Sequence, residues 1–270
     1  MRQFVVEKNP DKKGILIIDD KKKYHYLTSV LRMKTGDMIY VRLPDGELQN
    51  MAVAKIDEKE KKIKLQIAGE NVISNGVKAV PVAEKNNLEI TLFQFIPKSQ
   101  NLELIIRQAV ECGVSNIVLI DGEFCQKGNV ESVKKHLQEN DERFGKIITE
   151  AMQQSGSPVN TKISGWYSVE KSCDLFKEYC NVSGTVGFCL YEQSEGSKLV
   201  HQVVKETEEI KHAVIVCGAE GGISPDEVKM YKECGFNTVH FQTNILRCET
   251  AALYGISCIQ SAVLEKKIWM

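Results

Sequence analysis

Three charged residues near the C-terminal end of the chain stand in patterns that could do chemistry. Arg247 and Glu249 flank Cys248 in the stretch "NILRCETAAL", and Glu220 lies within the glycine-rich stretch "GAEGG". A guanidinium can hold a phosphate or stabilise an oxyanion, and a carboxylate can orient a substrate or accept a proton. The same arginine and glutamate could instead form an ordinary surface ion pair, so the residues alone leave both interpretations open.

The sequence around Glu220 predicts a strand, a glycine-rich loop and a helix in immediate succession. Residues 212–217, "HAVIVC", are strand-like, residues 218–222 include three glycines, and Ser224 with Glu227 forms a capping box at a helix start. Asp226 and Glu227 would repel a phosphate there, and neither common nucleotide-binding glycine motif is present. The glycines therefore either let a neutral or zwitterionic ligand approach the main chain or supply the positive φ of a tight turn.

From residue 88 onward the elements that must position these residues alternate between strand and helix. Apolar strand runs are separated by amphipathic helices, such as "RFGKIITEAMQQSG" at 143–156. This alternation predicts a mostly parallel α/β sheet that is covered on both faces. Ligands of such sheets bind beyond the carboxyl ends of the strands, where three distinctive loops are expected at 191–197, 218–224 and 242–250.

The first 70 residues predict a separate, small β-rich domain with one helix. The strand "KKIKLQI" should turn Ile63, Leu65 and Ile67 to one side, and the helix should carry Leu27 and Val30 on its apolar face. Residues 71–87, which include Gly, Asn and Pro, are expected to form a linker, and 88–270 to form the second domain.

The two expected domains also differ in net charge. Residues 1–70 carry 15 Lys and Arg against 11 Asp and Glu, whereas the remainder carries 20 against 25. A basic domain joined to an acidic one suggests a polyanion partner for the first domain, although such a surplus can also be a solvated face.

Cysteine, histidine and hydropathy patterns exclude other classes of protein. The nine cysteines form no C-x-x-C pair and are expected to be reduced small hydrophobes, and the five histidines lack metal-ligand spacing, so no metal is expected. No apolar run approaches the ~20 residues that span a bilayer, and the N-terminus lacks a signal-peptide pattern. We therefore expect a cytoplasmic protein without a membrane partner.

The C-terminal motifs resemble those of a known family. "GAEGGISPDEV" at 218–228, followed by "ILRCETAAL" at 245–253, is similar to the paired signatures of the SPOUT-class RNA methyltransferases, and in particular of the bacterial 16S ribosomal RNA (uracil-N3) methyltransferases. The segments 95–120 and 143–156 and the N-terminal "MRQFVVE" and "YHYLTSVLRMKTGDMIYVRLPDGE" match further parts of that family. Most of the chain is covered, and the motifs occur in the family's order.

The resemblance implies a fold, a cofactor and partners. A SPOUT-type sheet with a deep trefoil knot would follow a small PUA-like barrel, and the knot crevice would bind S-adenosylmethionine. The reaction would be methylation of the N3 atom of a uridine in 16S rRNA or the small ribosomal subunit, by a homodimer joined through the knotted domain.

The resemblance also implies residue roles. Catalysis would fall to Arg247, Glu220 and Glu249. The cofactor would contact Leu190, Tyr191, Gly218, Ala219, Glu220, Gly221, Gly222, Gln242, Asn244, Ile245, Leu246 and Thr250. RNA would contact Lys21, Lys22, Lys23, Arg32, Lys34, Lys98, Arg107 and Arg247.

The chain departs from the family pattern at several positions. Ala219 replaces a proline, Gln242 a glycine, and Asn244 and Ser157 arginines, while "GEFCQKGN" at 122–129 lacks another arginine. These changes affect expected RNA contacts more than the fold, and Gln242 could crowd the cofactor loop. Two alternatives follow: a non-catalytic RNA-binding or ribosome-assembly protein with this fold, or a related methyltransferase with another RNA target.

Overall fold

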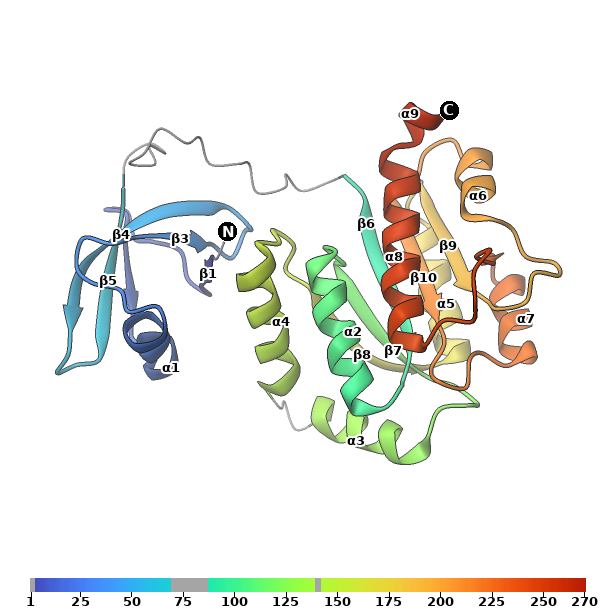
Figure 1. Ribbon diagram of the computed structural model, residues 1–270, viewed down its shortest axis with the longest axis horizontal. Helices are drawn as coiled ribbons and strands as arrows, with labels where there is room; N and C mark the ends of the chain where they lie inside the picture. Colours follow the sequence, from blue (N-terminus) through green and yellow to red (C-terminus); the bar gives the residue numbers. More distant parts are fainter. Residues whose placement is uncertain (1–2, 69–86, 139–141) are drawn as a thin grey trace. The chain divides into compact units, whose positions relative to one another are not determined.

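The computed structural model describes residues 3–68, 87–138 and 142–270, which form two compact units (Figure 1). The first unit holds residues 3–68 together with Met152–Pro158, and the second holds the other described residues. The expected linker at 71–87 lies outside the described residues except for Asn87.

The first unit is built on a five-stranded mixed sheet. Its strands lie in the order β1-β3-β4-β5-β2, with β1 parallel to β3 and the other neighbours antiparallel. The elements are β1 (Phe4–Val5), β2 (Ile15–Ile18), α1 (Lys21–His25), a π-helical turn η1 (Tyr26–Val30), β3 (Met38–Arg42), β4 (Leu48–Asp57) and β5 (Lys62–Ile67). These five strands and the single helical segment formed by α1 and η1 confirm the prediction of a β-rich unit. Leu27, Val41 and Leu65 are fully buried in its core.

Two details of this unit differ from the sequence prediction. Val30 was expected on the buried face of the helix but is 58% exposed. The cause is the π-helical turn, in which the Leu31 N–H donates to the Tyr26 carbonyl five residues back and shifts the angular spacing of the side chains. Ile63 and Leu65 are buried as predicted, but Ile67, at the end of β5, is partly exposed.

A buried polar network ties the segment 152–158 into the first unit. The Arg42 guanidinium, 4% exposed, donates to Gln3 Oε1 at 2.7 Å, to the Gly46 carbonyl at 2.7 Å and to the Gly156 carbonyl at 3.1 Å. Gln3 Nε2 donates to the carbonyls of Met152 and Ser157. Burial lowers the pKa of Arg42. Its charge is stabilised by the Gln3 side chain and by two carbonyls, that of Gly46 in the turn between β3 and β4 and that of Gly156 just after α4, where a cation is favoured.

The second unit contains a six-stranded sheet in the order β11-β9-β10-β6-β7-β8, with every pairing parallel. The strands are β6 (Glu89–Phe95), β7 (Asn116–Asp121), β8 (Lys162–Ser168), β9 (Thr185–Leu190), β10 (His212–Cys217) and β11 (Asn237–Val239). The predicted parallel α/β sheet is therefore confirmed. Because β6 to β8 extend the sheet in one direction and β9 to β11 in the other, the carboxyl edge near β10 and β6 lies at a change of strand order, where ligands bind in such sheets.

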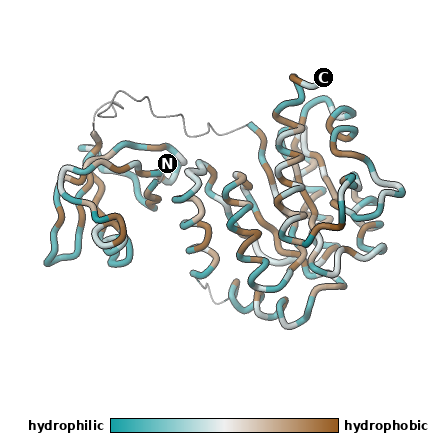
Figure 2. Tube along the Cα trace, in the orientation of Figure 1, coloured by the Kyte–Doolittle hydropathy of each residue, from teal (hydrophilic) through white to brown (hydrophobic). Residues whose placement is uncertain are grey.

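Helices cover both faces of this sheet (Figure 1). The helices that follow β6 are α2 (Ser99–Glu111), α3 (Lys127–Gln138), α4 (Glu142–Ser155), α5 (Val169–Cys180), α6 (Val200–Glu206), α7 (Pro225–Glu233), α8 (Cys248–Leu264) and α9 (Lys266–Trp269), of which α9 continues beyond the end of α8. In the figure α2 and α8 lie in front of the strands and α5 lies behind them, and α8 packs against α2, α6 and β10 while α5 packs against α7 and β9. Figure 2 shows these strands as mainly hydrophobic, as burial on both faces requires.

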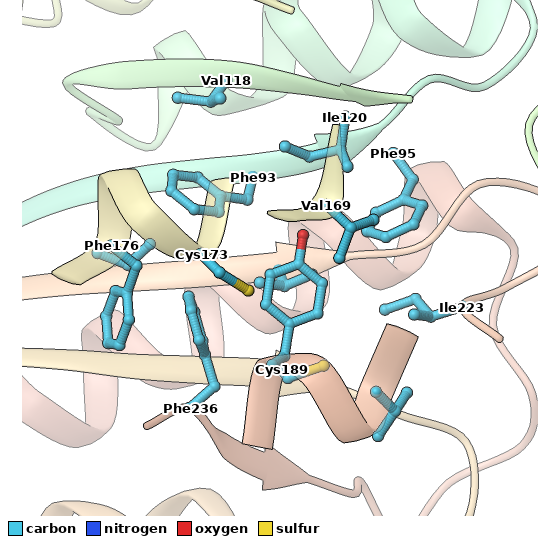
Figure 3. Close-up of a cluster of buried hydrophobic side chains, with 14 of the residues drawn as sticks. Phe93, Phe95, Val118, Ile120, Val169, Cys173, Phe176, Cys189, Ile223 and Phe236 are labelled. Atoms are coloured by element: carbon cyan, nitrogen blue, oxygen red, sulfur yellow. The ribbon is translucent and has the colours of Figure 1, made fainter. Parts of the chain in front are cut away.

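The core between α5, α7 and the sheet is aromatic (Figure 3). Phe176 of α5 and Phe236, just before β11, lie with ring centroids 3.9 Å apart. A Cβ atom at Gly187 of β9 would come within 2.5 Å of Phe236, so this glycine makes room for the pair. Cys173 and Cys189 belong to the same core, and Cys217 and Cys248 are also buried, as predicted for small hydrophobes, whereas Cys180 is exposed.

Within residues 3–68, 87–138 and 142–270, none of the helices has the length and apolarity needed to cross a membrane.

The Arg42 network provides a test of the first unit. Arg42→Met keeps the apolar stem but leaves the carbonyls of Gly46 and Gly156 without their donor. We expect the free energy of unfolding of the full chain to fall by about 2–3 kcal/mol, measured by urea denaturation. The exposed Arg107 on α2 offers a control, since Arg107→Met should change that free energy by less than about 0.5 kcal/mol. Equal stability of the two variants would contradict the role given to Arg42.

Candidate active site

The three predicted loops come together at the carboxyl edge of the parallel sheet. They follow β9, β10 and β11, which are neighbours in the sheet, and with the start of α8 they enclose a pocket of about 550 Å³. The pocket is lined by Lys98, Asn101, Leu190, Tyr191, Glu192, Cys217, Gly218, Ala219, Glu220, Gly221, Gly222, Ile223, His240, Phe241, Thr243, Asn244, Ile245, Leu246, Arg247, Cys248, Glu249 and Ala251. Most residues of two of the three loops, 218–224 and 242–250, thus line the pocket.

The glycine loop packs against itself. A Cβ atom at Gly218 would lie 2.8 Å from the carbonyl carbon of Gly222, and Gly222 has a φ of 76°. The Gly222 N–H donates to the Ala219 carbonyl at 3.0 Å and closes the turn. The two interpretations of the glycines therefore describe one loop, because the tight turn is also the wall of the pocket.

Side chains from the neighbouring elements hold this loop in place. Glu220 Oε1 accepts hydrogen bonds from the Lys98 backbone N–H at 3.0 Å and from Asn101 Nδ2 at 2.7 Å. Lys98 is the N-cap of α2 and offers no side-chain cap, so the Glu220 carboxylate satisfies donors at the positive end of that helix. On the inner side, Gln94 Nε2 donates to the Gly218 carbonyl at 3.1 Å.

The predicted capping box after the loop is confirmed. Glu227 Oε2 accepts from the Ser224 N–H at 2.9 Å, and the Ser224 hydroxyl accepts from the Glu227 N–H at 3.4 Å. Glu227 is buried, and its Oε1 accepts from the Glu123 N–H at 2.7 Å. The Glu227 carboxylate and the Ser224 hydroxyl thus occupy donors at the start of α7, which leaves this helix start unsuited to a phosphate.

Arg247 and Glu249 both face the pocket from the start of α8 but do not form the ion pair considered from sequence. Within the described residues, no salt bridge joins them, and Arg247 is exposed at the N-cap position. The Cys248 thiol donates to Glu249 Oε2 at 3.3 Å. Burial, reinforced by the hydrogen bond to Glu249, raises the pKa of Cys248 to about 12, so its sulfur stays protonated near neutral pH and is a poor nucleophile.

Most of the predicted site residues are brought together. The three expected catalytic residues and ten of the twelve expected cofactor residues line the pocket. Gln242 and Thr250 are exposed and do not line it, so Gln242 does not crowd the pocket. Among the residues expected to contact RNA, Lys98 and Arg247 line the pocket.

The remaining expected RNA-binding residues lie elsewhere. Lys21, Lys22 and Lys23 are on α1, where Lys23 Nζ contacts Glu7 Oε1 at 2.8 Å, and Arg32 and Lys34 are exposed in the loop after η1. Arg107 is exposed on α2.

Sequence reasoning missed several pocket residues. Asn101 lies in the first turn of α2 and binds Glu220, which is 119 positions away, so no local pattern could have indicated it. Glu192 stands in the loop at 191–197 and lines the pocket, and the position of that loop after β9 was the available signal. His240 lines the pocket from the end of β11. Among the described residues, no group of three His, Cys, Asp or Glu side chains is arranged to hold a metal ion.

Comparison with known sequences gives matches over the second unit and over most of the chain. Residues 84–260 match the family described as RNA methyltransferase domain. The chain is 31% identical over 268 residues to ribosomal RNA small subunit methyltransferase E 2 of Borreliella burgdorferi, a match that covers 98% of each chain. It is 26% identical over 242 residues to ribosomal RNA small subunit methyltransferase E of Bacillus subtilis, covering 87% of this chain and 86% of the relative.

Solved structures show the same fold over nearly the whole chain. Ribosomal RNA small subunit methyltransferase E of Neisseria gonorrhoeae, solved with S-adenosylmethionine bound, superimposes with a TM-score of 0.74 at 20% identity and covers 97% of both chains. A methyltransferase from Legionella pneumophila, in complex with the same cofactor, also gives a TM-score of 0.74 at 20% identity, over 97% of this chain and 98% of that one. From the domain match over residues 84–260 and the 31% identity to the Borreliella protein, the chain belongs to the RNA methyltransferase family that includes the ribosomal RNA small subunit methyltransferases E.

Proposed function

We propose that this methyltransferase uses S-adenosylmethionine to methylate the N3 atom of a specific uridine in the 16S ribosomal RNA of the small subunit. The observation that carries the proposal is the pocket at the carboxyl edge of the sheet, which is lined by residues 218–223 of one family motif and by residues 245–249 and 251 of the other. The cofactor supplies an electrophilic methyl group on a sulfonium ion.

The chemistry of the pocket fits this cofactor. Its lining carries three carboxylates, Glu192, Glu220 and Glu249, against the cationic side chains of Lys98 and Arg247. S-adenosylmethionine carries a sulfonium and an ammonium group against one carboxylate, so an acidic lining favours it over a phosphate-bearing nucleotide. The glycine turn leaves room for adenosine and methionine parts to lie against the main chain, with Leu190, Tyr191 and residues 244–246 on the other walls.

The chemistry of the uracil base determines what the pocket residues must do. The ring nitrogen at position 3 of uracil lies between two carbonyl groups and is weakly acidic, so its proton must leave before a methyl group is accepted. We propose that Arg247 stabilises the negative charge that develops on the base or binds an RNA phosphate. Glu249 is the better candidate for the proton acceptor, because Glu220 Oε1 already accepts two hydrogen bonds from the start of α2. Positioning and electrostatic stabilisation then supply most of the acceleration.

RNA binding is assigned to both units. The target base must leave its stack to reach the pocket. We propose that residues 1–70 form a PUA-like domain whose Lys21, Lys22, Lys23, Arg32 and Lys34 contact phosphates, and that Lys98 and Arg107 contact RNA near the pocket. The net charge of +4 over residues 1–70 supports this assignment.

The finer features of the fold belong to the same proposal. We propose that residues 88–270 form a SPOUT domain with a deep trefoil knot, that 71–87 link it to the first domain, and that two copies associate through the knotted region in the cytoplasm. The match of residues 84–260 to the RNA methyltransferase domain supports this proposal.

The direct test is mass mapping of small-subunit RNA from a strain that lacks the gene. One uridine should lose a methyl group at N3 and regain it when purified protein and S-adenosylmethionine are added to the isolated subunits. A methyl group lost from another RNA would point to a related methyltransferase with a different target. Binding of the subunits without methyl incorporation would instead favour a ribosome-assembly protein.

The glycine turn gives a test of the cofactor site. Gly218→Ala would push a methyl group into the Gly222 main chain and force the pocket wall to move. We expect the Kd for S-adenosylmethionine, measured by calorimetry, to rise by about 10-fold or more, which is ~1.4 kcal/mol. Gly145→Ala on α4 is the matched control, because its Cβ atom meets no other atom within 4 Å. A Gly218→Ala variant that binds the cofactor as tightly as this control would contradict the proposed site.

The role of Arg247 is separable from cofactor binding. Arg247→Ala should lower kcat for methyl transfer by about 100-fold, because it removes charge stabilisation at the reacting base. The Kd for S-adenosylmethionine should change by less than about 3-fold, which is ~0.7 kcal/mol. A parallel loss of cofactor affinity would show that Arg247 holds the cofactor instead.

A further inference from the structure

An exposed aromatic side chain, Phe124, contacts the glycine turn that lines the pocket. Phe124 follows the end of β7 and is 45% exposed. A Cβ atom built on Gly221, which lines the pocket, would lie 2.8 Å from the Phe124 Cβ and 3.5 Å from its Cγ. The base of the phenylalanine side chain therefore rests directly on the glycine turn, and Gly221 has no side chain to displace it.

The turn that carries Phe124 is firmly held. The Glu123 N–H donates to the buried Glu227 carboxylate, and the Cys125 N–H donates to the Gly122 carbonyl at 3.0 Å. Gly122 is itself packed tightly, because a Cβ atom there would come within 2.2 Å of the Phe95 ring. Burial raises the pKa of the Cys125 thiol, which packs inward against the aromatic core. The Phe124 side chain, by contrast, is 45% exposed.

We propose that Phe124 is a stacking platform that receives one face of the extruded target base. This inference rests on the proposed RNA methylation and names a residue that positions the substrate. A base taken out of a helix loses its stacking neighbours and needs a replacement surface, and an aromatic ring offers one for any pyrimidine or purine. Phe124 has the required features: an exposed ring, a fixed backbone, and contact with the pocket wall at Gly221.

The proposal separates Phe124 from the cofactor-binding residues. Phe124 is not among the residues that line the pocket, and its contact with the pocket wall is through Gly221. Removing the ring should therefore weaken productive binding of RNA and leave cofactor affinity unchanged. An aromatic replacement should restore function, whereas an aliphatic one of similar bulk should not.

The experiment measures methyl transfer to small ribosomal subunits isolated from a strain lacking the gene, with four variants of the full chain. Phe124→Ala and Phe124→Leu should each lower kcat/KM for the subunits by roughly 5- to 100-fold, whereas Phe124→Tyr should stay within about 3-fold of the unsubstituted protein. Calorimetry should give all of these proteins the same Kd for S-adenosylmethionine within about 2-fold. Trp166→Ala, which removes another exposed aromatic ring of the same unit, is the control and should leave kcat/KM unchanged.

The outcomes distinguish the two proposals. If the unsubstituted protein methylates the subunits and Phe124→Ala or Phe124→Leu does so equally well, the stacking role is overturned while the proposed function stands. A rise in the Kd for S-adenosylmethionine that accounts for the whole loss would also overturn it, because Phe124 would then act on the cofactor. If the unsubstituted protein binds S-adenosylmethionine but transfers no methyl group to RNA, both proposals fall.

Discussion

The main chain of residues 218–222 folds back on itself more closely than any residue with a side chain at Gly218 would allow, and the site depends on this approach. Gly218 meets the backbone of Gly222, and the turn closes through the hydrogen bond from the Gly222 N–H to the Ala219 carbonyl. Because the turn presents main chain to the pocket, its shape is fixed by backbone geometry. Its position is fixed by Gln94 beneath it and by α2 beside it.

Two glutamates connect this turn to the rest of the carboxyl edge. Glu220 binds the start of α2, and Glu227 caps its own helix while holding the turn after β7 through the Glu123 N–H. Each carboxylate meets two or more donors, many of them backbone N–H groups at helix starts, where negative charge is stabilised. Three loops from distant parts of the chain are thereby joined by side chains of one short segment.

The main features of the site could be predicted from the sequence because the loops that follow neighbouring parallel strands lie at the same edge of the sheet. Once strands and helices alternate, the loops after β9, β10 and β11 must share one edge, and Ser224 with Glu227 marked the start of α7. Side-chain directions and distant partners were less accessible. Whether Gln242 and Thr250 point into the pocket depends on the path of an irregular loop, and the bond from Asn101 to Glu220 joins segments 119 positions apart. The π-helical turn that exposes Val30 and the grouping of Met152–Pro158 with the first unit likewise arise from tertiary contacts that have no sequence period.

The packing of α8 behind the pocket has a consequence for how its size could change. A Cβ atom at Gly255 would lie 2.3 Å from Leu190 Cδ1, and Leu190 is part of the pocket wall. A larger residue at this position of the helix would force the Leu190 side chain to move, and with it a part of the pocket wall. The position of this part of the pocket wall therefore depends on a glycine of α8 that does not itself line the pocket.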